Sequence, residues 1–256
     1  MTMTEPTVDA VRPPALEHGT AMRLAATEYD RFLALLRALR AGDWTKPTDC
    51  PGWDVRMMAA HLLGMVEMAA SLREQRRQNK AAAARLEQHG GLFIDALTGV
   101  QVDERQDTPP AEIVARFAAR APKAAAARRR TPGFVRRRRL PVAQEVGGRL
   151  ETWTIGYLTD VILTRDPWMH RIDIARATGA ELVLTDEHDG VLVADVVDEW
   201  AGRHGAPCTL RLTGPAGGSW TRGTGGPTLE LDAVEFCRAI SGRSAGEGLL
   251  ATQVPF

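Results

Sequence analysis

Apolar residues recur every three or four positions through about the first 180 residues, a spacing typical of amphipathic helices. The segment 20–40 shows this pattern, and Gly42 is expected to end its helix. Its apolar positions are Met22, Leu24, Ala25, Tyr29, Phe32, Leu33, Leu36 and Leu39. Asp54 can cap a second helix that runs to about residue 78, with an alanine-rich continuation that Gly90 and Gly91 break near residue 88.

Two further helices are expected before Gly179. Pro110 suits the first turn of the third helix, because a proline there loses no intrahelical hydrogen bond. The fourth covers about 150–177, where Pro167 should kink it or lie near its start, and Gly179 is a natural C-terminal cap. Four helices with short or medium connections predict a helical bundle.

The composition changes after residue 179, where short alternating segments are separated by glycine and proline turns. The expected elements are a helix over 191–200, strands over 209–213, 219–221 and 228–231, and a closing helix over 233–241. The sequence therefore predicts a two-domain α+β fold. A flexible N-terminus over 1–17 precedes a four-helix bundle over 18–179, and a small α+β domain covers 180–256.

The charge pattern is balanced overall and uneven locally. Thirty-two basic and 32 acidic residues cancel among the 256, and the 44% hydrophobic and 25% charged content is ordinary for a globular protein. Arginines cluster at 128–130 and 136–139. We interpret this run as a solvated loop flanked by prolines and without an aromatic platform, so no nucleic-acid partner is expected. Binding of RNA, DNA or an anionic ligand remains the alternative.

Three widely spaced cysteines, Cys50, Cys208 and Cys237, contain no C-x-x-C pair. This spacing argues against a disulfide scaffold and against a zinc site made of thiolates. The first residues contain no basic region followed by an apolar run, and no window approaches 18 uninterrupted apolar residues. A reduced, cytoplasmic protein without a membrane partner is expected.

Two separated segments supply a candidate metal-ligand set. His61 lies in the apolar part of the second expected helix. Asp166 and His170 are four residues apart and therefore share one face of the fourth. Two imidazoles and one carboxylate suit a zinc-like ion and leave coordination positions open. Asp173 can then accept the second imidazole N–H of His170 and orient that ring, or pair with a neighbouring arginine.

Each half of this set also has an ordinary explanation. A single histidine on an apolar face is more often a hydrogen-bonded core residue than a metal ligand. Carboxylate–histidine pairs four residues apart are common on helix surfaces. The metal hypothesis therefore depends on whether the fold brings His61 to Asp166 and His170.

Three stretches resemble the mycothiol-dependent maleylpyruvate isomerase family, and together they extend over nearly all of the chain after about residue 20. They are 47–53 with His61, then 165–179, and the tail 235–243. The resemblance implies a DinB-like four-helix bundle joined to a domain similar to sterol carrier proteins. It also implies a divalent metal, usually zinc, held by His, Glu and His. These ligands correspond to His61, Asp166 and His170, so Asp166 stands where the family has glutamate.

The resemblance also implies the chemistry. Mycothiol would supply a thiol that the metal deprotonates, and the thiolate would attack a small electrophile or oxo-acid. In the isomerase reaction, the thiolate adds to a cis double bond, the resulting single bond rotates, and the thiol leaves to give the trans isomer. The broader class is thiol S-transferase.

The family places a functional arginine near the C-terminal helix, where Arg238 and Arg243 are both candidates for binding substrate carboxylates. Surface charge explains either arginine equally well. Cys50 is expected to be structural because nothing in the sequence supplies it with a base, so no protein nucleophile is expected. Trp53 and Trp168 are expected to pack the bundle.

Two other functions are compatible with the same residues. Metal-activated water would make the protein a hydrolase. The protein would instead be a non-catalytic binder if its metal were structural or absent and its C-terminal domain held an apolar ligand.

Overall fold

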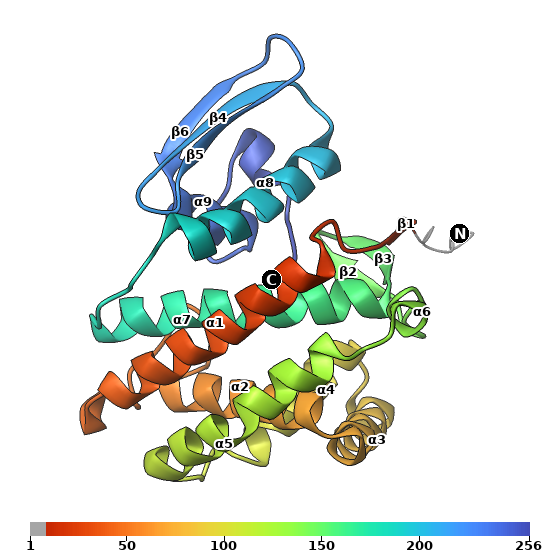
Figure 1. The fold of residues 1–256 in the computed structure, drawn as a ribbon, viewed down its shortest axis with the longest axis vertical. Coiled ribbons are helices and arrows are strands. Elements are labelled where there is room, and N and C mark those ends of the chain that lie inside the picture. Colours follow the sequence, from red (N-terminus) through yellow and green to blue (C-terminus); the bar gives the residue numbers. More distant parts are fainter. Residues whose placement is uncertain (1–8) are drawn as a thin grey trace. The chain divides into compact units, whose positions relative to one another are not determined.

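The computed structural model describes residues 9–256 (Figure 1). The chain divides into two compact units. The first extends to Gln144 and resumes over Leu150–Glu181, and the second comprises Glu145–Arg149 and Leu182–Phe256. This mostly helical chain with a small sheet-containing C-terminal region confirms the predicted α+β fold class. Of the flexible N-terminus expected over residues 1–17, residues 1–8 lie outside the described part of the chain, and Asp9–Arg12 forms strand β1.

The first unit is built mainly of helices. Their bounds are α1 His18–Ala38, α2 Val55–Ala70, α3 Leu72–His89, α4 Phe93–Asp103, α5 Pro110–Arg129, α6 Gly133–Arg136 and α7 Leu163–Thr178. A π-helical segment, Tyr157–Ile162, leads directly into α7. In the described part of the chain, no helix is long and apolar enough to span a lipid bilayer.

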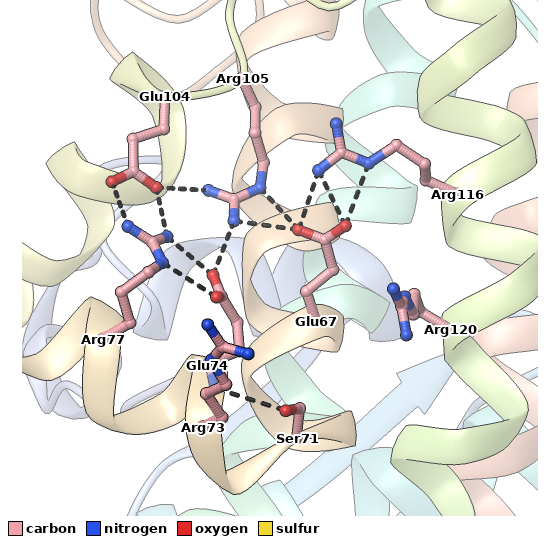
Figure 2. A pocket seen from close by; sticks show the side chains of 9 residues that line it. All are labelled: Glu67, Ser71, Arg73, Glu74, Arg77, Glu104, Arg105, Arg116 and Arg120. Carbon is pink, nitrogen blue, oxygen red and sulfur yellow. Dashed lines mark hydrogen bonds and ion pairs between the residues drawn. The ribbon is translucent and has the colours of Figure 1, made fainter.

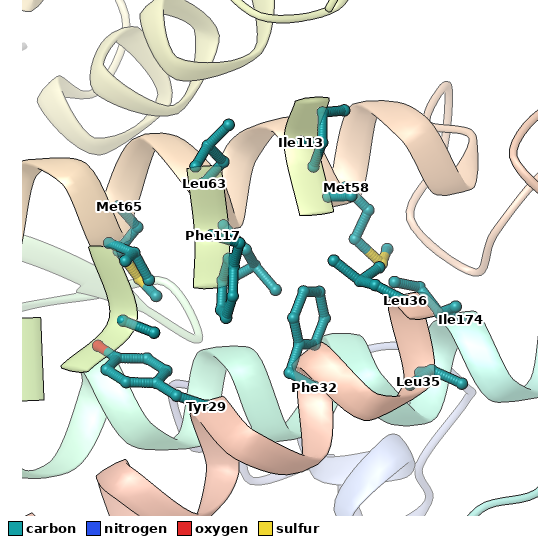
Figure 3. Packing of buried hydrophobic residues seen from close by; sticks show 14 of the residues in the cluster. Tyr29, Phe32, Leu35, Leu36, Met58, Leu63, Met65, Ile113, Phe117 and Ile174 are labelled. Carbon is teal, nitrogen blue, oxygen red and sulfur yellow. The ribbon is translucent and has the colours of Figure 1, made fainter. Parts of the chain in front are cut away.

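Helices α1, α2, α5 and α7 enclose one apolar core, as the amphipathic pattern predicted (Figure 3). Its large fully buried side chains include Phe32, Leu36, Met58, Leu63, Ile113, Phe117 and Ile174. The rings of Phe32 and Phe117 join α1 to α5 with centroids 5.3 Å apart. Burial of this apolar surface holds together the helices that carry the candidate ligands.

The second expected helix is interrupted. Ser71 adopts extended backbone angles (φ −150°, ψ 117°), so it ends α2 and caps α3 through its hydroxyl, which accepts from the amide of Glu74 at 3.4 Å. The prediction of one continuous helix was wrong here, because serine caps a helix as readily as it continues one. The sequence pattern also did not predict α4, which packs against α3 through a small apolar cluster around Ala82 and Leu97.

The start of the fourth expected helix is a strand instead. Arg149–Trp153 forms β3, which lies between β2 (Gln144–Val146) and β1 (Asp9–Arg12) in a three-stranded sheet. Strands β1 and β3 are parallel, and the Arg12 guanidinium binds the Glu151 carboxylate at 2.7 Å. Apolar residues of a short strand and of a buried helix are not distinguished by hydrophobicity alone.

Arg128 compensates for two irregularities before and within α7. The amide of Leu163 donates back to the carbonyl of Leu158, five residues earlier, in the π-helical segment. Pro167, the fifth residue of α7, has no N–H to donate to the carbonyl of Leu163. Arg128 donates to the Thr159 carbonyl at 2.6 and 2.9 Å and to the Leu163 carbonyl at 2.9 Å. The Arg128 guanidinium therefore supplies hydrogen-bond donors to the backbone carbonyls of Thr159 and Leu163.

The same guanidinium also binds side chains. Arg128 donates to the Tyr29 hydroxyl at 2.8 Å and to the Thr164 hydroxyl at 2.6 Å, and the residue is only 3% exposed. The expectation of a wholly solvated arginine run was therefore wrong for Arg128. It was also wrong for Arg136, which binds the fully buried Asp160 at 2.8 Å.

The rest of the arginine run is exposed, and an aromatic side chain lies within it. Phe134 on α6 is 61% exposed and supplies a single aromatic ring within the run. The exposed members of the run are Arg129, Arg130, Arg137, Arg138 and Arg139.

The second unit contains the elements expected after residue 180. They are α8 Val191–His204, β4 Cys208–Thr213, β5 Gly218–Arg222, β6 Thr228–Asp232 and α9 Ala233–Ile240. Strand β4 is central, antiparallel to β5 and parallel to β6. Gly226 permits the turn before β6, because it has φ +85° and a Cβ there would lie 1.9 Å from the Pro207 carbonyl oxygen.

Replacing Arg128 tests its structural role. Arg128→Met keeps much of the side-chain volume but leaves the carbonyls of Thr159 and Leu163 without the donors that bind them. Each unsatisfied buried acceptor costs about 1–3 kcal/mol, so we expect the free energy of unfolding to fall by at least about 2 kcal/mol in urea denaturation. The matched control is Arg129→Met, at an exposed position, which should change it by less than about 0.5 kcal/mol. Equal losses from both variants would contradict the assigned role.

Candidate metal centre

His61 is held in the middle of α2 by a defined helix start. The Asp54 carboxylate caps α2 by accepting from the Met57 amide at 2.8 Å. The residue His61 is only 7% exposed, and the centroid of its ring lies 5.4 Å from that of Trp53, which precedes the helix. Trp53 also packs against the bundle core, as expected from its sequence context.

The fold brings His61 to the pair on α7. The Nε2 atom of His61 lies 3.4 Å from Oδ2 of Asp166, and Nε2 of His170 lies 3.3 Å from Oδ1. The two imidazole centroids are 5.4 Å apart. One ligand atom from each of the three residues lies within 4.8 Å of the other two. The convergence on which the metal hypothesis depends is therefore present.

These separations fit a shared cation better than direct hydrogen bonds. A charge-assisted N–H···O⁻ bond is typically about 2.7–2.9 Å long. Ligand atoms bound about 2.0–2.2 Å from one tetrahedral ion stand about 3.3–3.5 Å apart. The shortest distances from Asp166 to His61 and His170, one from each carboxylate oxygen, fall in the second range. Among the described residues, buried Oδ2 of Asp166 has no partner with hydrogen-bond geometry.

Asp173 binds the other side of the His170 ring. Its fully buried carboxylate lies 3.2 Å from Nδ1 of His170, one helical turn from that residue. An Nδ1–H donated to Asp173 fixes the tautomer and leaves the Nε2 lone pair directed at Asp166 and His61. This is the arrangement in which a histidine can act as a metal ligand.

Cys50 lies beside the same groups, which the sequence did not reveal. Its Sγ is 3.8 Å from Oδ2 of Asp173, and it forms a second potential ligand group with His170 and Asp173. Only the folding of the turn before α2 against α7 creates this contact, because Cys50 and Asp173 are far apart in the sequence.

The carboxylate of Asp166 and the neighbouring imidazoles each stabilise the charged form of the other. Burial alone would raise the pKa of Asp166, but the two neighbouring imidazoles outweigh it and hold that pKa far below its ordinary value. Burial likewise opposes the charged form of His170, yet the Asp166 carboxylate raises the pKa of His170 well above 6.5. In the metal-free protein, the site therefore holds an anionic carboxylate next to a protonated imidazole.

The two arginine candidates lie in the second unit. Arg238 on α9 is buried, with Nε 3.3 Å from a carboxylate oxygen of Glu235. Arg243 follows α9 and lines a cavity of about 460 Å³ within that unit. A role for either arginine in substrate binding stays a prediction.

Comparisons with known proteins agree with this architecture. The family model described as mycothiol maleylpyruvate isomerase N-terminal domain matches residues 25–175. Two crystal structures of the mycothiol-dependent maleylpyruvate isomerase are similar, one of them a His→Ala mutant. Their TM-scores are 0.58 for the mutant and 0.56 for the other, at 12% and 14% identity, and each alignment covers 90% of this chain and 91% of that one. No curated protein sequence is significantly similar to this chain.

The coupling within the centre is testable by titration of the metal-free protein. Asp166→Asn removes the charge that raises the pKa of His170, so we expect that pKa to fall when followed by NMR of the imidazole resonances. His170 protonation stabilises the metal-free fold below about pH 6.5, and this contribution is lost as the pH rises through the raised pKa. Asp30→Asn, on the exposed face of α1, is the control. A His170 pKa that is the same in wild type and Asp166→Asn would contradict the coupling.

Proposed function

Because this chain belongs to the mycothiol maleylpyruvate isomerase family, we propose that it is a mycothiol-dependent metalloenzyme of the isomerase or thiol S-transferase type. The observation that carries the proposal is the convergence of His61, Asp166 and His170 in the bundle of that family. The substrate class is a small electrophile or oxo-acid.

His61, Asp166 and His170 would hold a divalent ion, and zinc matches the two-nitrogen, one-oxygen donor set. Three protein ligands leave a coordination position for a thiol. A zinc-like ion there would lower the pKa of that thiol and so supply a thiolate at neutral pH.

Side chains outside the ligand set keep the ligands in place. Asp173 orients His170 through Nδ1. Arg171, the next residue on α7, forms a buried ion pair with Glu28 of α1 at 2.7 Å. Aspartate is shorter than glutamate, so Asp166 would reach an ion shared with His61 only if α7 lies close to α2, and the apolar core that these helices share supports this.

In the proposed reaction, the sulfur of mycothiol bonds to one carbon of the substrate double bond, and the electron pair of that bond moves toward the adjacent oxo group. The former double bond then rotates as a single bond. Return of the electron pair expels the thiolate, so the thiol is regenerated and the isomer is released. With a different electrophile, the carbon–sulfur bond would remain, because the carbanion takes up a proton or a leaving group departs with its electron pair, and the product would be a thioether.

Substitution of one ligand tests the metal and the thiol dependence together. We expect wild-type protein to contain about one divalent ion per chain and to consume mycothiol with one of a panel of electrophiles. His170→Ala should lose the ion. Its turnover should fall by more than ~10–100-fold, which is the usual loss when a residue that only supports a metal ligand is replaced. Elemental analysis and a thiol-consumption assay provide the two measurements.

The matched control is His89→Ala, at an exposed position near the end of α3, which should leave both quantities unchanged. Wild-type protein without metal would contradict the proposal and favour the non-catalytic alternative. Metal-dependent turnover that does not require a thiol would contradict it in favour of a hydrolase.

Cys50→Ser tests whether the nucleophile comes from the protein. If mycothiol supplies the attacking sulfur, this variant only exchanges a weak S–H donor near Asp173 for a hydroxyl donor, so its rate should fall by less than about tenfold. The measurement is the rate of mycothiol consumption by the metal-loaded variant. A covalent substrate adduct on Cys50, detected by mass spectrometry of the wild-type protein, would overturn the assignment.

A further inference from the structure

A cavity of about 550 Å³ lies between α2, α3, α5 and the end of α4 (Figure 2). Five arginines line it: Arg73, Arg77, Arg105, Arg116 and Arg120. None of the proposed metal ligands is among its lining residues. His61 and the lining residue Glu67 are both on α2. Glu67 lies six positions after His61, so the two are about 9 Å apart along the helix axis and point in directions that differ by about two-thirds of a turn.

Three of the arginines are fixed by carboxylates. Arg105 is 3% exposed and meets Glu67 at 2.9 Å and Glu74 at 3.3 Å. Arg116 shares Glu67 at 2.8 Å. Figure 2 shows these guanidinium groups around the two glutamates. Each nitrogen of Arg105 meets Glu67, Glu74, Glu104 or the Gln101 carbonyl, and each nitrogen of Arg116 meets Glu67 or Glu112, so both guanidinium groups are fixed before any ligand arrives.

Arg77 completes this framework. It binds Glu74 at 2.7 Å and Glu104 at 2.6 Å. Its hydrogen bond is the main reason that the pKa of Glu74 falls to about 2. Its hydrogen bonds also lower the pKa of Glu104, so Glu74 and Glu104 both stay ionised at neutral pH and keep their ion pairs with Arg77.

The cavity carries an excess of positive charge. Its lining contains five arginines and three glutamates, which leaves two positive charges uncompensated. Within the described residues, Arg73 and Arg120 have no ion-pair partner; Figure 2 shows Arg120 without a dashed line. Glu112 also meets Arg116, at 3.3 Å, but it is 53% exposed and lies outside the lining, where water and salt screen it.

We propose that this cavity binds a small molecule through a phosphate-type dianion. Two negative charges match the excess, and arginine forks fit the tetrahedral oxygens of a phosphate with paired hydrogen bonds. The Ser71 hydroxyl, which lines the cavity, adds a donor. A volume of about 550 Å³ is within the range of small-ligand sites, so it has room for more than an isolated anion. This site is independent of the metal centre and of the thiol chemistry.

The test titrates inorganic phosphate into the full-length protein at low ionic strength, using calorimetry. We expect saturable binding that Arg73→Gln and Arg120→Gln each weaken about tenfold or more, since each removes a charge-assisted hydrogen bond. Both side chains are exposed and without ion-pair partners among the described residues, so the fold should tolerate the changes. The matched control is Arg76→Gln, an exposed position on α3 outside the lining, which should bind phosphate like the wild type.

Two further titrations locate the anion and identify its class. His170→Ala should bind phosphate unchanged, because the metal centre is a different site. Succinate, a dianion of different shape, should bind more weakly than phosphate. The proposal is overturned by absence of saturable binding, by equal weakening in Arg76→Gln, by loss of binding in His170→Ala, or by succinate binding as tightly as phosphate.

Discussion

The hydrogen bonds from the buried Arg128 guanidinium to the backbone before and within α7 are the constraint on which the geometry of the candidate metal centre depends. The π-helical segment and Pro167 alter the usual backbone pairing just where α7 begins. A backbone carbonyl buried without a donor is costly, and Arg128 supplies donors to the carbonyls of Thr159 and Leu163. Asp166 lies between these features, so the carboxylate that faces both histidines owes its position to an arginine on another helix.

Two kinds of contact determine the geometry of the candidate metal centre: apolar packing between helices and a hydrogen bond within α7. Packing of the apolar core holds α2 and α7 at a suitable distance, while Asp173 sets the rotation of the His170 ring. The core tolerates many apolar side chains of similar size, whereas ring orientation depends on one carboxylate. A bundle of this kind can therefore keep its architecture while the residues around the centre, such as Cys50, vary the chemistry.

The sequence was informative where periodicity or a motif decides the structure. It predicted the four main helices, the strands of the second unit and the spacing of Asp166 and His170. It did not predict the break at Ser71, the strand over Arg149–Trp153, or the contact of Cys50 with Asp173. Serine serves equally as a cap or a helix residue, and contacts between distant segments have no local pattern. The buried role of Arg128 was hidden for the same reason, since a run of arginines does not show which of them faces a carbonyl.

The three converging side chains come from α2 and α7, two helices that are far apart in the sequence. An unfolded chain offers them only singly or as a local pair, so the complete donor set exists solely in the folded bundle. Any ion retained there would shift the folding equilibrium toward the native state by the free energy of its own binding. Cellular metal supply would then govern how long this protein persists as well as how fast it works.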